Sequence, residues 1–227
     1  GAEPAGAGPP PFSVVALDIG GTKVAGCIAV YEHAGACPKV MLKKSIPTDA
    51  ARGGADVLAR VCELASELVV DAQMADVPAL AGIGVSSAGS IRESDGLVAF
   101  ASEIMPGWMG QPLGAALQER CGLPVAVLND VHAHALGELR HGAAKGAHVA
   151  LMVAAGTGLG GAVMIDGHLL GGAHGCAGAI GHVLHPAAVG HPSGWSGTGH
   201  LESVVAGSGI EECYRSRGGE AVSGARF

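Results

Sequence analysis

The segment LDIGGTK has the residue types that a polyphosphate site needs. Asp18 ends an apolar run, and Thr22 and Lys23 add a hydroxyl and an ammonium group. Gly20 and Gly21 carry no Cβ, so they would let backbone N–H groups approach anionic oxygens. The pattern predicts a phosphate-binding loop, and an ordinary tight turn between two strands is the alternative.

A similar segment recurs in the second half of the chain. Residues 149–165 contain an apolar run, the loop AAGTGLGG and a second apolar run, with Gly156, Thr157 and Gly158 inside the loop. Two hairpins of this kind in one chain indicate an internal duplication. Neither loop is a P-loop, because the Gly-Lys-[Ser/Thr] ending and the helix that follows it are missing.

Asn129 and Asp130 form a third candidate group. They follow an apolar run at residues 125–128 and precede a helical pattern at residues 132–141. Ligands of open α/β sheets bind at the carboxyl ends of the strands, which favours a role for Asp130 on a substrate. Asp130 could equally cap the helix that follows, and the spacing leaves both interpretations open.

These groups need strands and helices to position them, and the two alternate along the chain. We expect strands at residues 14–18, 24–30, 40–46, 81–86 and 125–128, and helices at 56–74, 110–121 and 132–141. This alternation indicates α/β layers. We expect a disordered leader at residues 1–12, an N-terminal α/β domain at 13–123 with the first loop, and a C-terminal α/β domain at 124–227 with Asp130 and the second loop.

Composition excludes several classes of function. The 227 residues carry a net charge of −7 with only 13 Lys and Arg, and no basic run exists, so we expect no nucleic-acid partner. No apolar stretch reaches the ~18–20 residues of a membrane span, and no signal peptide is present. We therefore expect a cytoplasmic protein with no membrane partner.

Four motifs in order resemble the ROK family of sugar kinases, within the actin/hexokinase-like (ribonuclease H-like) superfold. They are LDIGGTK, NDVHAHALGE, AAGTGLGG, and AGAIGH followed by GHLE, and the resemblance covers about Val14 to Tyr214. It implies duplicated α/β domains with a cleft between them. Family members continue beyond this point, so we expect the C-terminal part to be missing from this chain.

The resemblance also implies an ATP-dependent kinase that phosphorylates the 6-hydroxyl of a sugar. Asp130 would be the general base, and Asp18 would hold Mg²⁺ through water. ATP phosphates would be lined by Gly20, Gly21, Thr22, Lys23, Gly156, Thr157 and Gly158, and the sugar would contact Gly89, Asn129, Asp130, His182 and Glu202. The family also suggests a homodimer.

Departures from the family pattern bear on the substrate. Ala179 stands where the family has a sugar-binding glutamate, and Ile104, beside Glu103, stands where it has an asparagine. This variation resembles the bacterial N-acetylmannosamine kinases of the family, so we expect an amino sugar, N-acetylmannosamine. Glucose and N-acetylglucosamine are the alternatives, and a non-catalytic sugar sensor is the alternative of another class.

A second departure concerns zinc. The resemblance implies a zinc-binding histidine at His182, but Ser193, Trp195 and His200 stand where the family has cysteines. Tryptophan does not bind zinc and serine rarely does. We therefore do not expect a structural zinc ion.

Overall fold

The computed structural model describes residues 10–102, 105–173, 175–192 and 197–220. They fold as two compact units, one ending at Ala133 and the other beginning at His134. Residues 1–9 of the leader expected at 1–12 lie outside the described residues, and Phe12 already begins the first strand.

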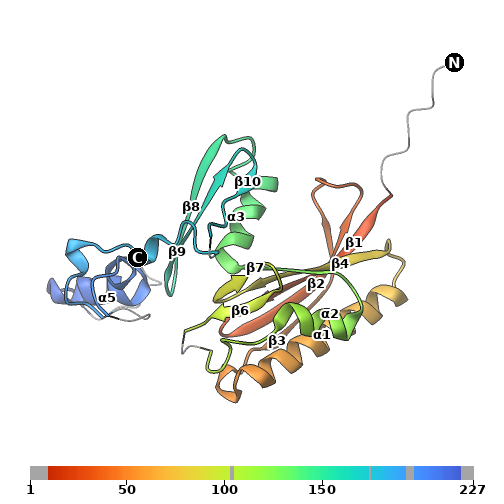
Figure 1. The fold of residues 1–227 in the computed structure, drawn as a ribbon, viewed down its shortest axis with the longest axis horizontal. Coiled ribbons are helices and arrows are strands. Elements are labelled where there is room, and N and C mark those ends of the chain that lie inside the picture. The colour runs from red at the N-terminus through yellow and green to blue at the C-terminus, as the bar shows by residue number, and fades with distance from the viewer. Residues whose placement is uncertain (1–9, 103–104, 174, 193–196, 221–227) are drawn as a thin grey trace. The chain divides into compact units, whose positions relative to one another are not determined.

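The first unit contains a five-stranded mixed sheet of strand order β3-β2-β1-β4-β7 (Figure 1). Its strands are β1 (Phe12–Ile19), β2 (Lys23–Tyr31), β3 (Lys39–Pro47), β4 (Leu80–Ser87) and β7 (Val125–Asn129). The first three strands pair antiparallel, whereas β4 and β7 run parallel to β1. The carboxyl ends of β1, β4 and β7 therefore share one edge of the sheet.

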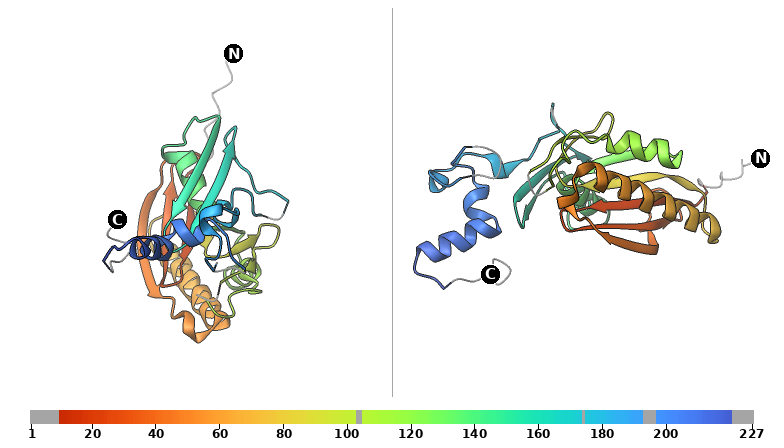
Figure 2. Two further views of the ribbon diagram at one scale, coloured as in Figure 1. Left: turned by 90° about the vertical axis from the view of Figure 1, so that its left-hand side faces the viewer. Right: turned by 90° about the horizontal axis from the view of Figure 1, so that it is seen from below.

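Two helices, α1 (Gly54–Met74) and α2 (Leu113–Cys121), pack against this sheet and against each other (Figure 2). Val57, Val61, Leu64 and Leu68 recur at helical spacing and are buried, as a helix with one core-facing side requires. Alternate residues of β1 are buried in the same core. The helix expected to begin at residue 110 begins after Pro112, because proline is tolerated at a helix start but not inside one.

The first unit extends past the domain boundary expected at residues 123 and 124. Strand β7 pairs with β4, which makes it the edge strand of the first sheet. Helix α3 (Asp130–His141) follows β7 without a break. A short hairpin of β5 (Ser90–Arg92) and β6 (Leu97–Phe100), which the sequence pattern did not indicate, follows β4.

The second unit contains a three-stranded antiparallel sheet of strand order β10-β9-β8. Its strands are β8 (Val149–Ala155), β9 (Leu159–Ile165) and β10 (His168–Leu169), and α4 (Glu202–Val205) and α5 (Gly207–Ser216) end the described part. Each unit thus has an antiparallel hairpin that carries one glycine loop. Short 3₁₀ turns complete the two units, at Ala50–Arg52 in the first and at Ile180–His182 and Pro186–Ala188 in the second.

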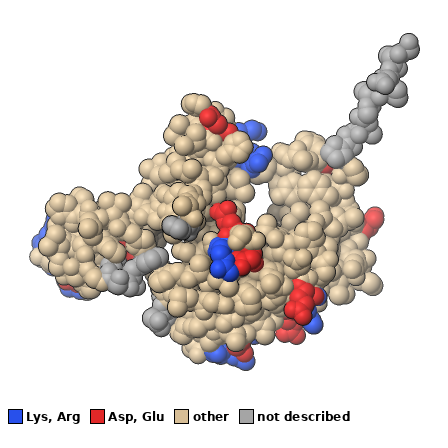
Figure 3. Space-filling view, in the orientation of Figure 1, with Lys and Arg blue, Asp and Glu red and all other residues tan. Residues whose placement is uncertain are grey.

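Charged side chains on the face shown in Figure 3 form small groups in which acidic and basic residues mix. Within the described ranges, none of the helices is both long enough and apolar enough to cross a bilayer.

Candidate active site

Asp18 lies near the carboxyl end of β1, and its side chain is exposed. Its neighbour on β4 is Ser86, whose hydroxyl donates to Asp18 Oδ1 at 2.8 Å. This bond orients the carboxylate and leaves Oδ2 to accept from water. Carboxylates held in this way suit Mg²⁺, which keeps much of its hydration shell.

The loop after Asp18 is a tight turn between β1 and β2. The N–H of Gly20 donates to the carbonyl of Lys23 at 3.0 Å, and Thr22 and Lys23 are exposed. A Cβ on Gly20 would come within 3.3 Å of the same carbonyl. A groove of about 440 Å³ lies beside the turn, and Asp18, Lys23 and Lys43 line part of it. The two ammonium groups could neutralise phosphate charge there.

Asn129, and not Asp130, caps helix α3. Asn129 Oδ1 accepts from the N–H groups of Val131 at 3.0 Å and His132 at 3.3 Å, the second and third residues of the helix. Its Nδ2 donates to the Gly89 carbonyl at 2.8 Å and to Asp130 Oδ1 at 2.9 Å. These four bonds use the whole capacity of the amide, so a sugar hydroxyl could bind Asn129 only by displacing one of them.

The cap leaves Asp130 available for chemistry. Its Oδ1 accepts from Asn129 Nδ2 and from the Val131 N–H at 2.8 Å, whereas no donor among the described residues bonds Oδ2. The carboxyl group is half-buried and stands at the edge where β1, β4 and β7 end. A carboxylate fixed through one oxygen can accept a proton on the other.

Gly89 connects β4 to this group. Its φ of 94° is a conformation that favours glycine, and a Cβ would come within 2.4 Å of the Phe100 carbonyl oxygen. Gly89 therefore contributes its carbonyl to Asn129 from a position that no larger residue can occupy without moving the backbone.

The second glycine loop joins β8 to β9. The Gly156 carbonyl accepts from the Gly207 N–H at 2.8 Å, and Glu202 Oε2 accepts from the Leu159 N–H at 2.8 Å. A Cβ on Gly158 would approach that same carboxylate oxygen to 2.7 Å. Thr157 is exposed at the tip, so its hydroxyl and backbone N–H are accessible to a ligand.

His182 and Glu202 both lie in the second unit, close enough for the charge of Glu202 to act on the His182 ring. The rings of His182 and His200 meet edge to face with centroids 5.5 Å apart. Burial lowers the pKa of His182. The charge of Glu202 acts against this lowering, and His200 adds to it. Among the described residues, no three His, Cys, Asp or Glu side chains gather as a metal site would require. Ser193 and Trp195 lie outside the described residues, so the expectation about zinc stays a prediction.

The lowered pKa of His182 predicts a pH dependence of stability. A pKa below the ordinary value of about 6.5 means that the unfolded state binds a proton more readily than the folded state. Stability present above about pH 6.5 should be lost as the pH falls through the folded pKa. His182→Gln should flatten this decline in thermal unfolding between pH 8 and 5, and the exposed His33→Gln should not. Equal pH dependence of stability in the unsubstituted chain, His182→Gln and His33→Gln would contradict the lowered pKa of His182.

Other residues of the site carried no signal in the sequence. Ser86 reaches Asp18 through strand pairing, and Lys43 reaches the groove through the fold of β3. Glu202 itself was expected to contact the sugar, but its bond to the Leu159 N–H was not indicated, because the two residues lie far apart in the chain. Glu103 and Ile104, the other positions considered for the sugar, lie outside the described residues.

Comparison with known proteins identifies the family. The family model described as "ROK family" matches residues 14–226. The chain belongs to the ROK family. Its mixed α/β fold matches solved ROK structures: the ROK hexokinase from Thermus thermophilus has a TM-score of 0.73 and 30% identity, over 93% of this chain and 66% of that one.

Relatives with assigned names include glucokinases and N-acetylmannosamine kinases. The glucokinase of Halalkalibacterium halodurans is 35% identical over 86% of this ROK chain and 57% of its own length. The N-acetylmannosamine kinase of Citrobacter koseri is 30% identical over 88% of this chain and 63% of its own length. A Streptomyces griseus glucokinase, solved in complex with glucose and AMPPNP, has a TM-score of 0.71 and 27% identity over 90% of this chain and 61% of that one. The chain thus spans about half to two thirds of the length of these relatives.

Proposed function

We propose that this chain carries the catalytic residues of an ATP-dependent sugar kinase that phosphorylates a sugar 6-hydroxyl. The observation that carries the proposal is the state of Asp130, whose carboxylate is held through Oδ1 at the carboxyl end of β7 while Oδ2 accepts nothing within the described residues. The other role considered for Asp130 was to cap helix α3. Asn129 fills that role, because its Oδ1 accepts from N–H groups of the first turn.

In the proposed reaction, Asp130 Oδ2 accepts the proton of the sugar hydroxyl. The hydroxyl oxygen forms a bond to the γ-phosphorus of ATP, and the bond from that phosphorus to the β–γ bridging oxygen breaks, which releases ADP. Phosphoryl transfer requires mainly alignment and charge neutralisation. A positioned carboxylate therefore suffices as the base.

The two glycine loops would bind the phosphates of ATP. In the first unit, Gly21 and Thr22 offer N–H groups, Thr22 a hydroxyl and Lys23 an ammonium, and Gly20 lines the loop with its own N–H bonded to the Lys23 carbonyl. In the second unit, Thr157 and Gly158 offer N–H groups and a hydroxyl, and Gly156 lines the loop with its N–H bonded to the Gly158 carbonyl. Asp18 would hold Mg²⁺, which when bound neutralises phosphate charge. The exposed carboxylate with its Ser86 contact fits this role.

For the substrate we propose N-acetylmannosamine, bound in part by Gly89, His182 and Glu202. The small apolar side chain of Ala179 precedes the turn that carries His182, and it would leave room for an acetamido methyl group. Glucose is the second candidate, and the 35% identity to a named glucokinase favours it. Homodimer formation and a cytoplasmic location stay predictions.

An assay of ADP release with ATP and Mg²⁺ tests the proposal. N-acetylmannosamine, glucose and N-acetylglucosamine are offered separately, and kcat/KM is expected to be highest for N-acetylmannosamine. If kcat/KM is highest with glucose, then glucose and not N-acetylmannosamine is the substrate. ADP release at background with all three sugars would overturn the kinase assignment and favour a sugar-binding sensor.

A further inference from the structure

Thr48 contacts the first glycine loop from the side of β3. It is fully buried, immediately after the end of β3. Its hydroxyl donates to the Gly20 carbonyl at 2.6 Å, and its N–H donates to the Thr22 carbonyl at 2.9 Å. One residue thus holds two carbonyl groups of the proposed phosphate loop.

Holding these carbonyls fixes the directions of two N–H groups. A trans peptide is planar, and its C=O and N–H point in opposite directions. No described peptide bond is cis. The Gly20 carbonyl faces Thr48, so the Gly21 N–H points away from Thr48. The Thr22 carbonyl also faces Thr48, so the Lys23 N–H points away from it as well. For Lys23 the side away from Thr48 is the side of β1 and Gly20, because β2 lies between β3 and β1. Thr48 thus sets the Gly21 N–H as a donor on the side of the turn opposite β3, where an anion could bind.

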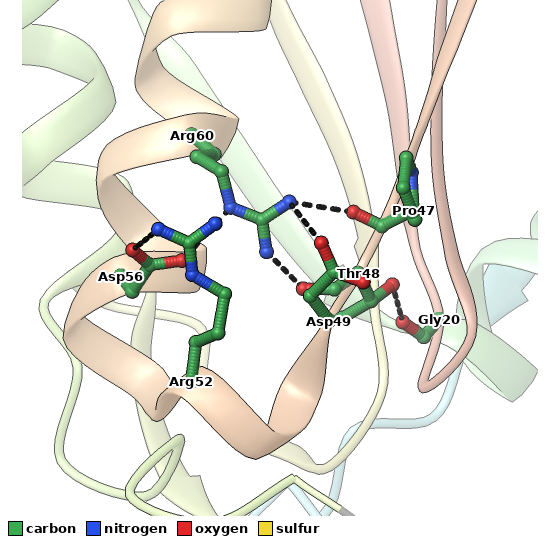
Figure 4. Close-up of polar contacts among 7 residues, drawn as sticks. All are labelled: Gly20, Pro47, Thr48, Asp49, Arg52, Asp56 and Arg60. Carbon is green, nitrogen blue, oxygen red and sulfur yellow. Dashed lines mark hydrogen bonds and ion pairs between the residues drawn. The ribbon is translucent and has the colours of Figure 1, made fainter.

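Arg60 of α1 holds Thr48 in turn (Figure 4). Its guanidinium donates to the Pro47 carbonyl at 2.6 Å and to the Thr48 carbonyl. Asp56 accepts a hydrogen bond from Arg60 Nε at 2.9 Å. Asp49 forms an ion pair with the same guanidinium at 3.7 Å. The Arg60 side chain is only 20% exposed. Its planar guanidinium can bond several acceptors at once, which the single ammonium of a lysine could not do in the same geometry.

A second link between β3 and α1 allows this role to be separated from general stability. Lys44 of β3 pairs with Glu67 at 2.9 Å and Asp71 at 2.8 Å, both on α1. Lys44 lies opposite Gly26 on β2, whereas Pro47 lies opposite Lys23 beside the loop. The Lys44 link joins the same two elements without contacting the glycine loop.

We infer that Thr48 and Arg60 are positioning residues for phosphate binding by the first loop. Thr48 orients the Gly21 N–H and holds the turn through the Gly20 and Thr22 carbonyls. Arg60 fixes Thr48 through the carbonyls of Pro47 and Thr48. The inference rests on the proposed function, because it assumes that the first loop binds the phosphates of ATP.

The first test replaces the hydroxyl alone. Thr48→Val keeps the shape and the backbone N–H but removes the donor to Gly20, so the Kd for ATP with Mg²⁺ should rise about tenfold. Thr48→Ser restores the hydroxyl and should restore the Kd. Calorimetric titration of the chain with ATP, and separately with N-acetylmannosamine, gives both constants. The Kd for the sugar should stay within about twofold, because loss of one net hydrogen bond at the loop does not reach the sugar contacts.

The second test compares the two links between β3 and α1. Arg60→Met should raise the Kd for ATP about fivefold. The double substitution Glu67→Gln and Asp71→Asn breaks the Lys44 link from the α1 side, and it should leave the Kd unchanged because neither residue lines the groove beside the loop. Hydrogen exchange on the ligand-free proteins should be faster in the Ile19–Val24 peptide of Thr48→Val and Arg60→Met than in that of the double variant.

The outcomes separate the two proposals. No ATP binding by the unsubstituted chain overturns the proposed function, and this inference with it. ATP binding that Thr48→Val leaves unchanged, or that Thr48→Ser fails to restore, overturns the inference and leaves the proposed function standing. A parallel loss of ATP and sugar binding, equal in Arg60→Met and in the double variant Glu67→Gln and Asp71→Asn, shows general destabilisation and also overturns the inference.

Discussion

Replacing Asp130 by asparagine is expected to lower the turnover number for sugar phosphorylation by about a hundredfold to ten-thousandfold, the usual contribution of a positioned general base. Asparagine has the same shape, and its oxygen can still accept from the Val131 N–H, as Asp130 Oδ1 does. The amide nitrogen would replace Oδ2, which is the atom that has to take the proton. Sugar binding should persist, because the substitution removes a proton acceptor and leaves the local backbone in place.

The matched control for this substitution is Asp95→Asn. Asp95 is an exposed carboxylate of the same unit that pairs with Arg92, between β5 and β6 of the short hairpin. Turnover of Asp95→Asn should equal that of the unsubstituted chain. If Asp130→Asn kept turnover within about tenfold of that chain, far less than a base contributes, the proton would have another acceptor and the assignment of Asp130 would be wrong.

Replacing Gly89 by alanine is expected to destabilise the fold by about 3 kcal/mol, from a positive φ together with overpacking. The φ of 94° disfavours any Cβ, and the added carbon would lie 2.4 Å from the Phe100 carbonyl oxygen. Relief of that overlap would move the Gly89 carbonyl away from Asn129 Nδ2. Turnover should therefore fall along with the free energy of unfolding, because Asn129 also holds Asp130.

Gly84→Ala provides the control for this second substitution. Gly84 lies in β4 as well, and the nearest atom to an added Cβ is Val14 Cγ1 at 3.9 Å, an ordinary contact. Denaturant unfolding of both variants measures the difference. Equal free energies of unfolding for Gly84→Ala and Gly89→Ala would show that the Gly89 turn adapts, and the predicted coupling to Asn129 would fail.

The sequence predicted the elements that have a clear hydrophobic period. The apolar runs of β1, β2, β8 and β9 and the helical spacing in α1 all correspond to observed elements. The hairpin of β5 and β6 was missed because strands of three and four residues are too short to show a period. The first unit reaches Ala133 because β7 pairs with β4, and such a long-range pairing leaves no mark in the local pattern.

Residue types could be read at the site, but hydrogen-bond partners could not. The sequence left open whether Asp130 caps α3, and the structure gives the cap to its neighbour Asn129. Thr48 and Arg60 were not singled out, because one threonine and one arginine form no motif. Their contacts with the first loop arise only when β3 and α1 pack beside it. Membership of the ROK family, in contrast, follows from motif order and is confirmed.

Phosphorus NMR of a mixture of the chain, ATP, Mg²⁺ and N-acetylmannosamine observes the proposed transfer itself. ATP resonances are expected to give way to those of ADP and of a phosphate ester on the sugar 6-oxygen, and Asp130→Asn is expected to slow this change about a hundredfold or more. Unchanged ATP resonances, or inorganic phosphate without a sugar phosphate, would contradict the proposed transfer.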